Sequence, residues 1–129
     1  MSILLTGFDA FGGEAVNPSW LMLEAFNGTH IEGHAVHARR LPTAFGHSLL
    51  ALAQHIDDLQ PDLVIAFGQA GGRSTVSPER VAVNCDDARI ADNAGNQPVD
   101  TRIFAHAQNA YFNTLPIKAT LLALQQAGI

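Results

Sequence analysis

Short, unbroken runs of apolar residues predict the strands of this protein. Residues 3–6 form such a run and stop at Gly7, which is typical of a strand buried on both faces. Residues 63–67, with the sequence Leu-Val-Ile-Ala-Phe, give the clearest strand and also run into glycine. Residues 35–41 predict a weaker strand. Residues 81–83 predict one more weak strand, antiparallel to a neighbour.

Helical patterns separate the strands. Asn17 is placed to cap a helix that has Pro18 at its first position. We expect this helix to continue to about Phe26 and to stop at Gly28. Because nearly every residue over 20–25 is apolar, the helix is predicted to be well buried.

Two more helices follow from apolar residues spaced three or four positions apart. The first has one apolar face and ends at Pro61; that face consists of Phe45, Leu49, Leu52, Ile56 and Leu59. The second opens at Pro116 and stops at Gly128, with an apolar face made of Ile117, Leu121 and Leu124.

The order of these elements predicts the fold. Strand, helix, strand, helix, strand favours a mostly parallel sheet with helices on both faces, which is an α/β fold. We expect a single domain over residues 1–129. Ligands of such folds bind beyond the carboxyl ends of the strands, so the glycine-rich loops at 7–13 and 68–73 are predicted to lie at one sheet edge. Residues 86–100 read as a long polar loop. The chain ends on a helix where a further strand is expected, so it looks cut within the fold.

Composition narrows the class of protein. Hydrophobic residues make up 47% of the chain and charged residues 15%, which excludes a disordered protein. The formal net charge is −5 without a basic stripe, which argues against a nucleic-acid partner. No apolar run reaches the roughly 20 residues of a membrane helix. The N-terminus lacks positive residues and reads as a strand, not a signal peptide. With one cysteine, we expect a soluble, cytoplasmic protein.

Several side chains are candidates for chemistry. Phe8 and Phe11 lie on the first glycine-rich loop, where they favour a small apolar pocket and a core role equally. The loop matches neither a dinucleotide nor a P-loop pattern. The six histidines and the aspartates of residues 86–100 lack the spacing of zinc or calcium ligands, so we expect no metal and no cofactor. Cys85 precedes two aspartates that raise its pKa, and we interpret it as a buried, inert thiol.

Pattern alone leaves Gln69, Glu79 and Arg89 ambiguous, but longer motifs do not. The chain contains five groups of residues in order: 6–14 (Thr-Gly-Phe-Asp-Ala-Phe-Gly-Gly-Glu), 17–20 (Asn-Pro-Ser-Trp), 67–84 with Gln69 and Ser-Pro-Glu-Arg at 77–80, 87–98, and 111–117. Together they resemble the pyrrolidone-carboxylate peptidase family (pyroglutamyl-peptidase I) over essentially the whole chain.

The resemblance implies a cysteine peptidase that removes N-terminal pyroglutamate from peptides, built as a three-layer α/β/α sandwich and commonly a homo-oligomer. It implies that Glu79 supports the catalytic histidine and that Arg89 helps to stabilise the oxyanion. It also implies that Phe8 and Phe11 wall the pyroglutamyl pocket and that Gln69 binds the polar edge of the lactam. Such a pocket suits a small, neutral, half-apolar ring.

One departure from the family pattern matters for activity. The nucleophilic cysteine and the histidine of the family lie beyond Ile129, and Cys85 matches an aliphatic position of the family. The chain is therefore predicted to resemble the N-terminal part of the family and to be inactive alone. Two other classes stay open: a non-catalytic binding or interaction module, and a small phosphate or nucleotide binder built on the glycine loops.

Overall fold

The computed structural model describes all residues from 1 to 129, and they form two compact units. The first unit consists of Met1–Gln69 together with Ile90–Gln97. The second consists of Ala70–Arg89 together with Pro98–Ile129. The single domain expected from chain length stays a prediction, and each unit is described by itself.

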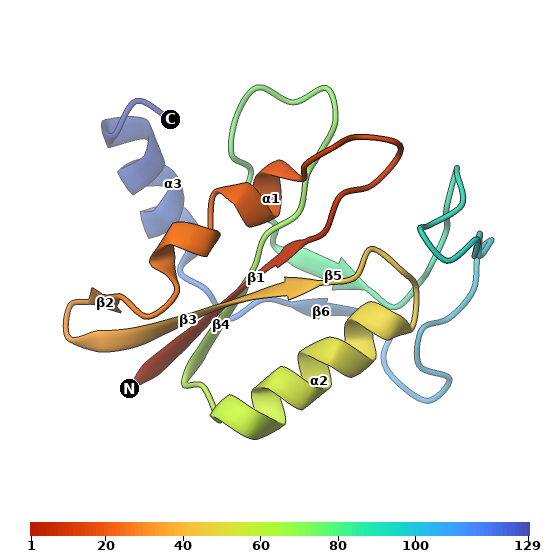
Figure 1. Ribbon diagram of the computed structural model, residues 1–129, viewed down its shortest axis with the longest axis horizontal. Helices are drawn as coiled ribbons and strands as arrows, with labels where there is room; N and C mark the ends of the chain where they lie inside the picture. Colours follow the sequence, from red (N-terminus) through yellow and green to blue (C-terminus); the bar gives the residue numbers. More distant parts are fainter. The chain divides into compact units, whose positions relative to one another are not determined.

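The first unit is built on a four-stranded sheet with the order β2-β3-β1-β4. Its central strand β1 (Ser2–Phe8) is parallel to β3 (His34–Leu41) on one side and to β4 (Leu63–Ala66) on the other. The short β2 (His30–Ile31) adds an antiparallel edge to β3. This arrangement confirms the expected mostly parallel sheet (Figure 1).

Helices cover both faces of this sheet. The chain passes from β1 to β3 through α1 (Pro18–Leu21) and the 3-10 helix η1 (Glu24–Phe26). It then returns past β1 to β4 through α2 (His47–Leu59). Right-handed crossovers made in opposite directions put their helices on opposite faces. Figure 1 shows α1 and α2 on the two sides of the strands, so the unit has the three layers of an α/β/α sandwich.

The first predicted helix differs from the structure in length and burial. Asn17 does cap it, and Pro18 is its first residue. The α-helix has only four residues, however, and η1 follows instead of a continuous helix. The side chains of Leu21 and Met22 are 55% and 47% exposed. The physical reason is that consecutive apolar residues point all round a helix, whereas the sheet covers a single side of it.

The core of the first unit lies between β1, β3 and the α1 side of the sheet. Its buried members alternate along the strands and are joined by one residue that follows α1: Ile3, Leu5, Val36, Ala38 and Leu23. Partly buried side chains pack against them, namely Trp20, Leu63, Ile65 and Phe67. Strand β1 is therefore buried on both faces as predicted, with Leu4 and Thr6 fully buried on the opposite face. It does not stop at Gly7 as predicted but continues to Phe8, because its pairing with β3 extends to Leu41.

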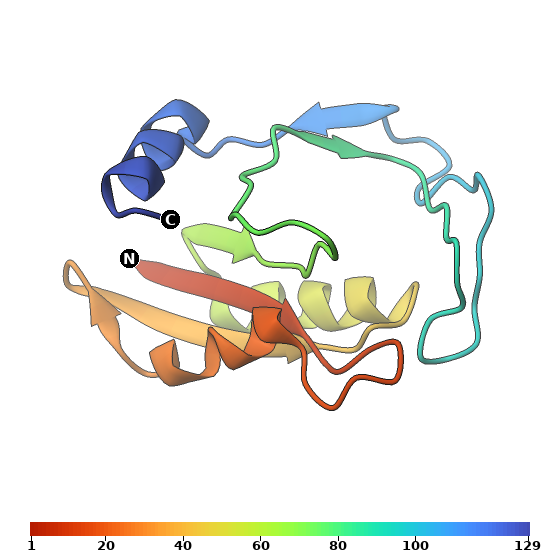
Figure 2. The same ribbon diagram turned by 90° about the horizontal axis from the view of Figure 1, so that it is seen from above.

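The second unit contains a small antiparallel pair and a helix. Strand β5 (Val81–Val83) pairs with β6 (Ala110–Phe112), which confirms the predicted antiparallel strand (Figure 2). The helix α3 (Ile117–Gln126) confirms the last predicted helix, and Gly128 follows it with a φ of +76°. No helix in the structure is long and apolar enough to cross a membrane.

Candidate active site

The loops of the first unit leave the sheet at a point where the strand order reverses. From β1 the chain moves to β3, and from β3 it moves back past β1 to β4. The carboxyl ends of β1 and β4 therefore border the kind of switch point at which open α/β sheets bind ligands. The register pairs Thr6 with Ala66, and the amide of Phe67 donates to the Thr6 oxygen at 2.8 Å. Both strands thus end at the same edge.

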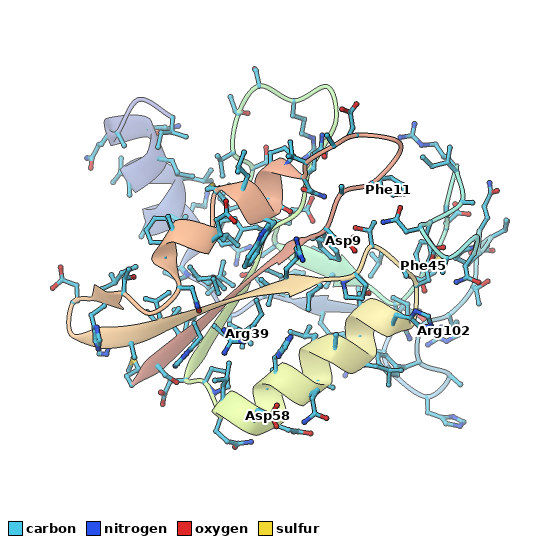
Figure 3. The ribbon with its side chains drawn as sticks, viewed as in Figure 1. Asp9, Phe11, Arg39, Phe45, Asp58 and Arg102 are labelled. Atoms are coloured by element: carbon cyan, nitrogen blue, oxygen red, sulfur yellow. The ribbon has the colours of Figure 1, made fainter.

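Three candidate binding residues come from this edge. Phe8 is the last residue of β1, and its amide donates to Ser19 Oγ at 3.0 Å. Phe11 lies on the following loop, which Figure 3 shows beyond the end of β1. Both rings are half-buried, whereas Leu4 in β1 is fully buried. Gln69 is exposed and follows β4. Their roles in binding stay predictions.

A hollow of about 220 Å³ adjoins the first loop. Apolar and charged side chains share its lining: Phe8, Ala15, Val16, Trp20 and Leu21, with Glu24 and Arg40. The Arg40 guanidinium lies 5.8 Å from the centroid of the Trp20 ring, a cation–π distance. Phe11 and Gln69 are not part of this lining, so the hollow on its own does not unite the three candidates.

Asp9 fixes the loop that follows Phe8 and carries Phe11. Its Oδ1 accepts from the Thr43 amide at 2.7 Å, and its backbone oxygen accepts from Asn17 Nδ2 at 2.9 Å and from Thr43 Oγ1 at 3.1 Å. The Asp9 amide donates to the Leu41 oxygen at 3.0 Å. The start of the loop is thereby tied to the helix cap of α1 and to the loop that follows β3.

A second segment, Ile90–Gln97, also belongs to the first unit. Asp92 shapes it: Oδ1 accepts from the amides of Ala94 and Asn96, and Oδ2 accepts from the Phe45 amide at 2.6 Å. Desolvation acts to raise the pKa of Asp92, but these N–H donors outweigh it and lower the pKa. No group of three or more His, Cys, Asp or Glu side chains in the structure is arranged to hold a metal ion.

Sequence reasoning gave no role to Asp9, Asn17, Thr43 or Asn93 in shaping the site. Asn17 is predicted as a helix cap, and Asp92 and Asn93 lie within the motif group 87–98. Their hydrogen bonds join positions up to 84 residues apart. A periodicity within one segment carries no information about such pairs. The five motif groups include Asp9, Asn17 and Asn93, and no sequence pattern indicated Thr43.

The second unit carries the remaining candidates. Glu79 precedes β5, and its backbone oxygen accepts from Asn113 Nδ2. Its side chain is 74% exposed, and Oε1 lies 3.9 Å from Arg73 Nη1. An exposed pair at that distance contributes little, so the carboxylate keeps its capacity for another partner. Arg89 is exposed as well. The catalytic roles of Glu79 and Arg89 stay predictions.

Cys85 is a poor nucleophile in this structure. It is half-buried instead of buried as expected, because the short strand pair β5-β6 does not cover it, and its Sγ donates to Asp100 Oδ1 at 3.7 Å. Desolvation raises the pKa of the thiol, and the hydrogen bond and charge of Asp100 raise it further, as do the charges of Asp87 and Asp86. This confirms the expectation that neighbouring aspartates raise the pKa. A protonated thiol attacks carbonyl carbon poorly.

Comparisons with known proteins agree with the resemblance found in the five groups of residues. A family model described as pyroglutamyl peptidase matches residues 1–129. A pyrrolidone-carboxylate peptidase of Klebsiella pneumoniae (strain 342) is 58% identical over 127 residues, which are 98% of this chain and 59% of that protein. A protein of the same name from Yersinia pestis (strain Pestoides F) is 54% identical over 127 residues, again 98% of this chain and 59% of that protein. The chain thus spans about three-fifths of the length of these relatives.

Solved structures give the same result. The crystal structure of pyroglutamyl peptidase I from Bacillus amyloliquefaciens has a TM-score of 0.96 and 46% identity, covering 99% of this chain and 61% of that one. A mutant pyrrolidone carboxyl peptidase from Pyrococcus furiosus has a TM-score of 0.97 and 43% identity, covering 100% and 62%. Because the family model matches the chain from its first to its last residue, this chain belongs to the pyroglutamyl peptidase family.

Proposed function

We propose that this chain provides the substrate-binding part of an enzyme that removes N-terminal pyroglutamate from peptides. The observation that supports it most is a pair of half-buried rings at the switch point of the sheet: Phe8 at the end of β1, and Phe11 on the loop that follows, which Asp9 anchors. Pyroglutamate is a small neutral lactam with an apolar ring edge and a polar amide edge. Aromatic walls and a few polar groups match it.

The proposed roles follow from chemistry as well as resemblance. Phe8 and Phe11 contact the faces of the lactam ring, and the exposed amide of Gln69 pairs with its polar edge. Glu79 accepts from the histidine that carries the proton, which keeps that imidazole in the correct orientation. Arg89 supplies a fixed positive charge for the oxyanion that forms when a thiolate attacks the acyl carbon.

The reacting thiol is the part this chain does not supply in our proposal. Its single cysteine, Cys85, has a raised pKa and an aspartate as hydrogen-bond acceptor. The relatives are longer than this chain, which covers 59% of their length. We therefore propose that residues outside these 129 carry the thiol and the histidine, and that the 129-residue chain binds substrate without hydrolysing it.

A binding or interaction module is the second candidate for the isolated chain. The raised pKa of Cys85 favours it, because a lactam pocket without a thiolate binds and releases its ligand unchanged.

As further expectations, we propose a homo-oligomer and a cytoplasmic location. Light scattering measures the first, and fractionation of the source cells measures the second.

A thermal-shift assay paired with a hydrolysis assay tests the proposed function. Free pyroglutamate or a pyroglutamyl dipeptide should raise the melting temperature, because a ligand that binds the folded state stabilises it, whereas a nucleotide should not. The same preparation should release nothing measurable from a pyroglutamyl reporter, since losing the nucleophile and base costs on the order of a million-fold in turnover. Stabilisation by nucleotide alone contradicts the proposal. So does turnover that iodoacetamide abolishes through Cys85.

A further inference from the structure

The segment Ile90–Gln97, which we call the strap, returns to the first unit although the residues on either side of it belong to the second. Its amide hydrogen bonds make a tight turn: Asp92 N donates to Asn96 O at 2.8 Å, and Gly95 N donates to Asp92 O at 3.1 Å. The carboxylate of Asp92 closes the same turn from inside. Hydrogen bonds within the strap therefore fix its backbone conformation.

Two bonds fasten the strap beside the start of α2. The Phe45 amide donates to Asp92 Oδ2 at 2.6 Å, and the Asn93 amide donates to the Thr43 oxygen at 3.0 Å. Thr43 in turn donates to Asp9 from both its amide and its hydroxyl. Figure 3 shows Asp9, Phe11 and Phe45 at this end of the sheet. The strap is thus seated on the same loop that anchors Asp9.

The side chain of Asn93 contacts the loop of residues 9–14 directly, which we call the aromatic loop because it follows Phe8 and carries Phe11. Its Nδ2 donates to the Ala10 oxygen at 2.7 Å and to Asp9 Oδ1 at 3.3 Å. The Ala10 carbonyl belongs to the peptide that leads into Phe11, so this bond fixes the peptide next to the ring. One amide nitrogen thus contacts two acceptors, on Asp9 and Ala10, in the loop between Phe8 and Phe11.

The rest of the loop has little else to hold it. Beyond Phe11 it contains Gly12 and Gly13, with φ values of +68° and +83°. A β-carbon added to either glycine would have no atom within 4 Å, so no neighbouring segment packs against them. The bond from the Glu14 amide to the Phe11 oxygen is long, at 3.3 Å. Glycines leave many backbone conformations open, so the loop depends on contacts from other segments for its shape.

We propose that Asn93 is a positioning residue that sets the spacing of Phe8 and Phe11 and thereby the selectivity of the site for a planar lactam ring. This proposal rests on the proposed function. The amide at position 93 donates to two acceptors, the Ala10 carbonyl and the Asp9 carboxylate, and the latter also accepts from the Thr43 amide. A carboxylate there would face the charge of Asp9, and an aliphatic side chain would leave both oxygens without this partner.

Two substitutions at position 93 of the 129-residue chain test it, with one matched control and one fallback variant. Asn93→Ala removes the donor, and Asn93→Asp replaces it with an acceptor of the same size. The matched control is Asn96→Ala, which removes an amide from the same strap; its Nδ2 makes one long contact of 3.4 Å, to Asp92, and none to the loop. Asn93→Ser keeps a shorter donor and serves in place of Asn93→Ala should that variant not fold.

Two readouts separate a positioning role from a merely structural one. Calorimetric titration with pyroglutamyl-alanine should show affinity about five- to tenfold weaker for Asn93→Ala than for the control, as expected for one lost hydrogen-bond donor, and weaker still for Asn93→Asp. Hydrogen exchange should quicken at the amides of residues 10–14 and stay unchanged in β1 and β3. A structural role would instead speed exchange throughout the first unit.

Each outcome decides something. Unchanged affinity together with unchanged exchange at residues 10–14 overturns the positioning role. Exchange that quickens throughout the unit overturns it as well. If the unsubstituted chain does not bind pyroglutamyl-alanine, the proposed function fails, together with the selectivity assigned to Asn93. Local exchange in Asn93→Ala still decides whether this residue holds the loop.

Discussion

A β-carbon on Gly7 would lie 2.6 Å from the backbone oxygen of Ser19. The first turn of α1 therefore rests directly on the backbone of β1, with no room for a side chain between them. The amide next along the chain, that of Phe8, donates to Ser19 Oγ. This close approach places α1 and the aromatic loop relative to the sheet.

Gly7→Ala should therefore destabilise the chain. The atoms that the new methyl group meets are backbone atoms of Ser19 and Trp20, which cannot rotate away. Overpacking of this kind costs about 1–3 kcal/mol of unfolding free energy. Urea denaturation followed by circular dichroism measures it. Gly68→Ala is the control, because nothing lies within 4 Å of its added carbon; equal losses in the two variants would refute the close-packing account.

Asn17→Ala should weaken the same region by a different route. Asn17 Oδ1 accepts from Ser19 N at 3.0 Å and from Ser19 Oγ at 2.8 Å, and its Nδ2 donates to the Asp9 oxygen. Loss of such a cap costs about 1–2 kcal/mol of unfolding free energy. The denaturation midpoint reports it, with Asn96→Ala as the matched change. A midpoint equal to that of the control would show that the cap contributes nothing.

The stability of the first unit should fall in acid because of Asp92. Since its pKa is lowered in the folded state, its contribution is complete above the ordinary carboxyl pKa of about 4 and is lost as the pH falls through the lower folded value. Asp92→Asn should be less stable at neutral pH and should show a shallower loss in acid. Thermal unfolding of both proteins from neutral pH downward tests this, and parallel curves would contradict it.

Cys85 should react slowly with alkylating reagents at neutral pH. Desolvation and the bond to Asp100 raise its pKa, so little thiolate is present. We expect iodoacetamide to alkylate Cys85 more slowly than it alkylates the thiol of free glutathione. The substitution Asp100→Asn should speed the alkylation of Cys85. Mass spectrometry over a range of pH gives both rates. Modification faster than that of glutathione would identify Cys85 as an activated thiol and reopen its role as the nucleophile.

The larger elements of the first unit could be predicted because each is specified locally. The apolar runs of β1 and β4 and the periodicity of α2 are contained in a few neighbouring residues. The two-residue β2 was missed because a turn creates it: Glu32 and Gly33 have φ values of +49° and +79°, which suit a tight hairpin. Strand β6 has three residues like β5, but its sequence Ala-Tyr-Phe lacks the β-branched residues on either side of Ala82 that made β5 recognisable.

The candidate site was accessible to sequence analysis only in part. Phe8, Phe11 and Gln69 could be placed at one edge because parallel neighbouring strands end together. Their proposed roles came from the resemblance of longer motifs to a known family. An aromatic residue near a glycine-rich loop suits a pocket and a core equally well. The bonds from Asn93 to Asp9 and Ala10 follow from tertiary structure alone, since they join residues more than 80 positions apart.

The central claim is that Phe8, at the end of β1, and Phe11, on the loop that follows, recognise a pyroglutamyl ring. Two-dimensional NMR of the 129-residue chain, titrated with pyroglutamyl-alanine and separately with prolyl-alanine, tests it most directly. The dipeptides differ mainly in the lactam carbonyl and the charge of the ring nitrogen. We predict saturable shifts at the amides of Phe8, Phe11 and Gln69 with the pyroglutamyl dipeptide and none with the prolyl one. Equal responses to both, or shifts confined to other parts of the chain, would contradict the claim.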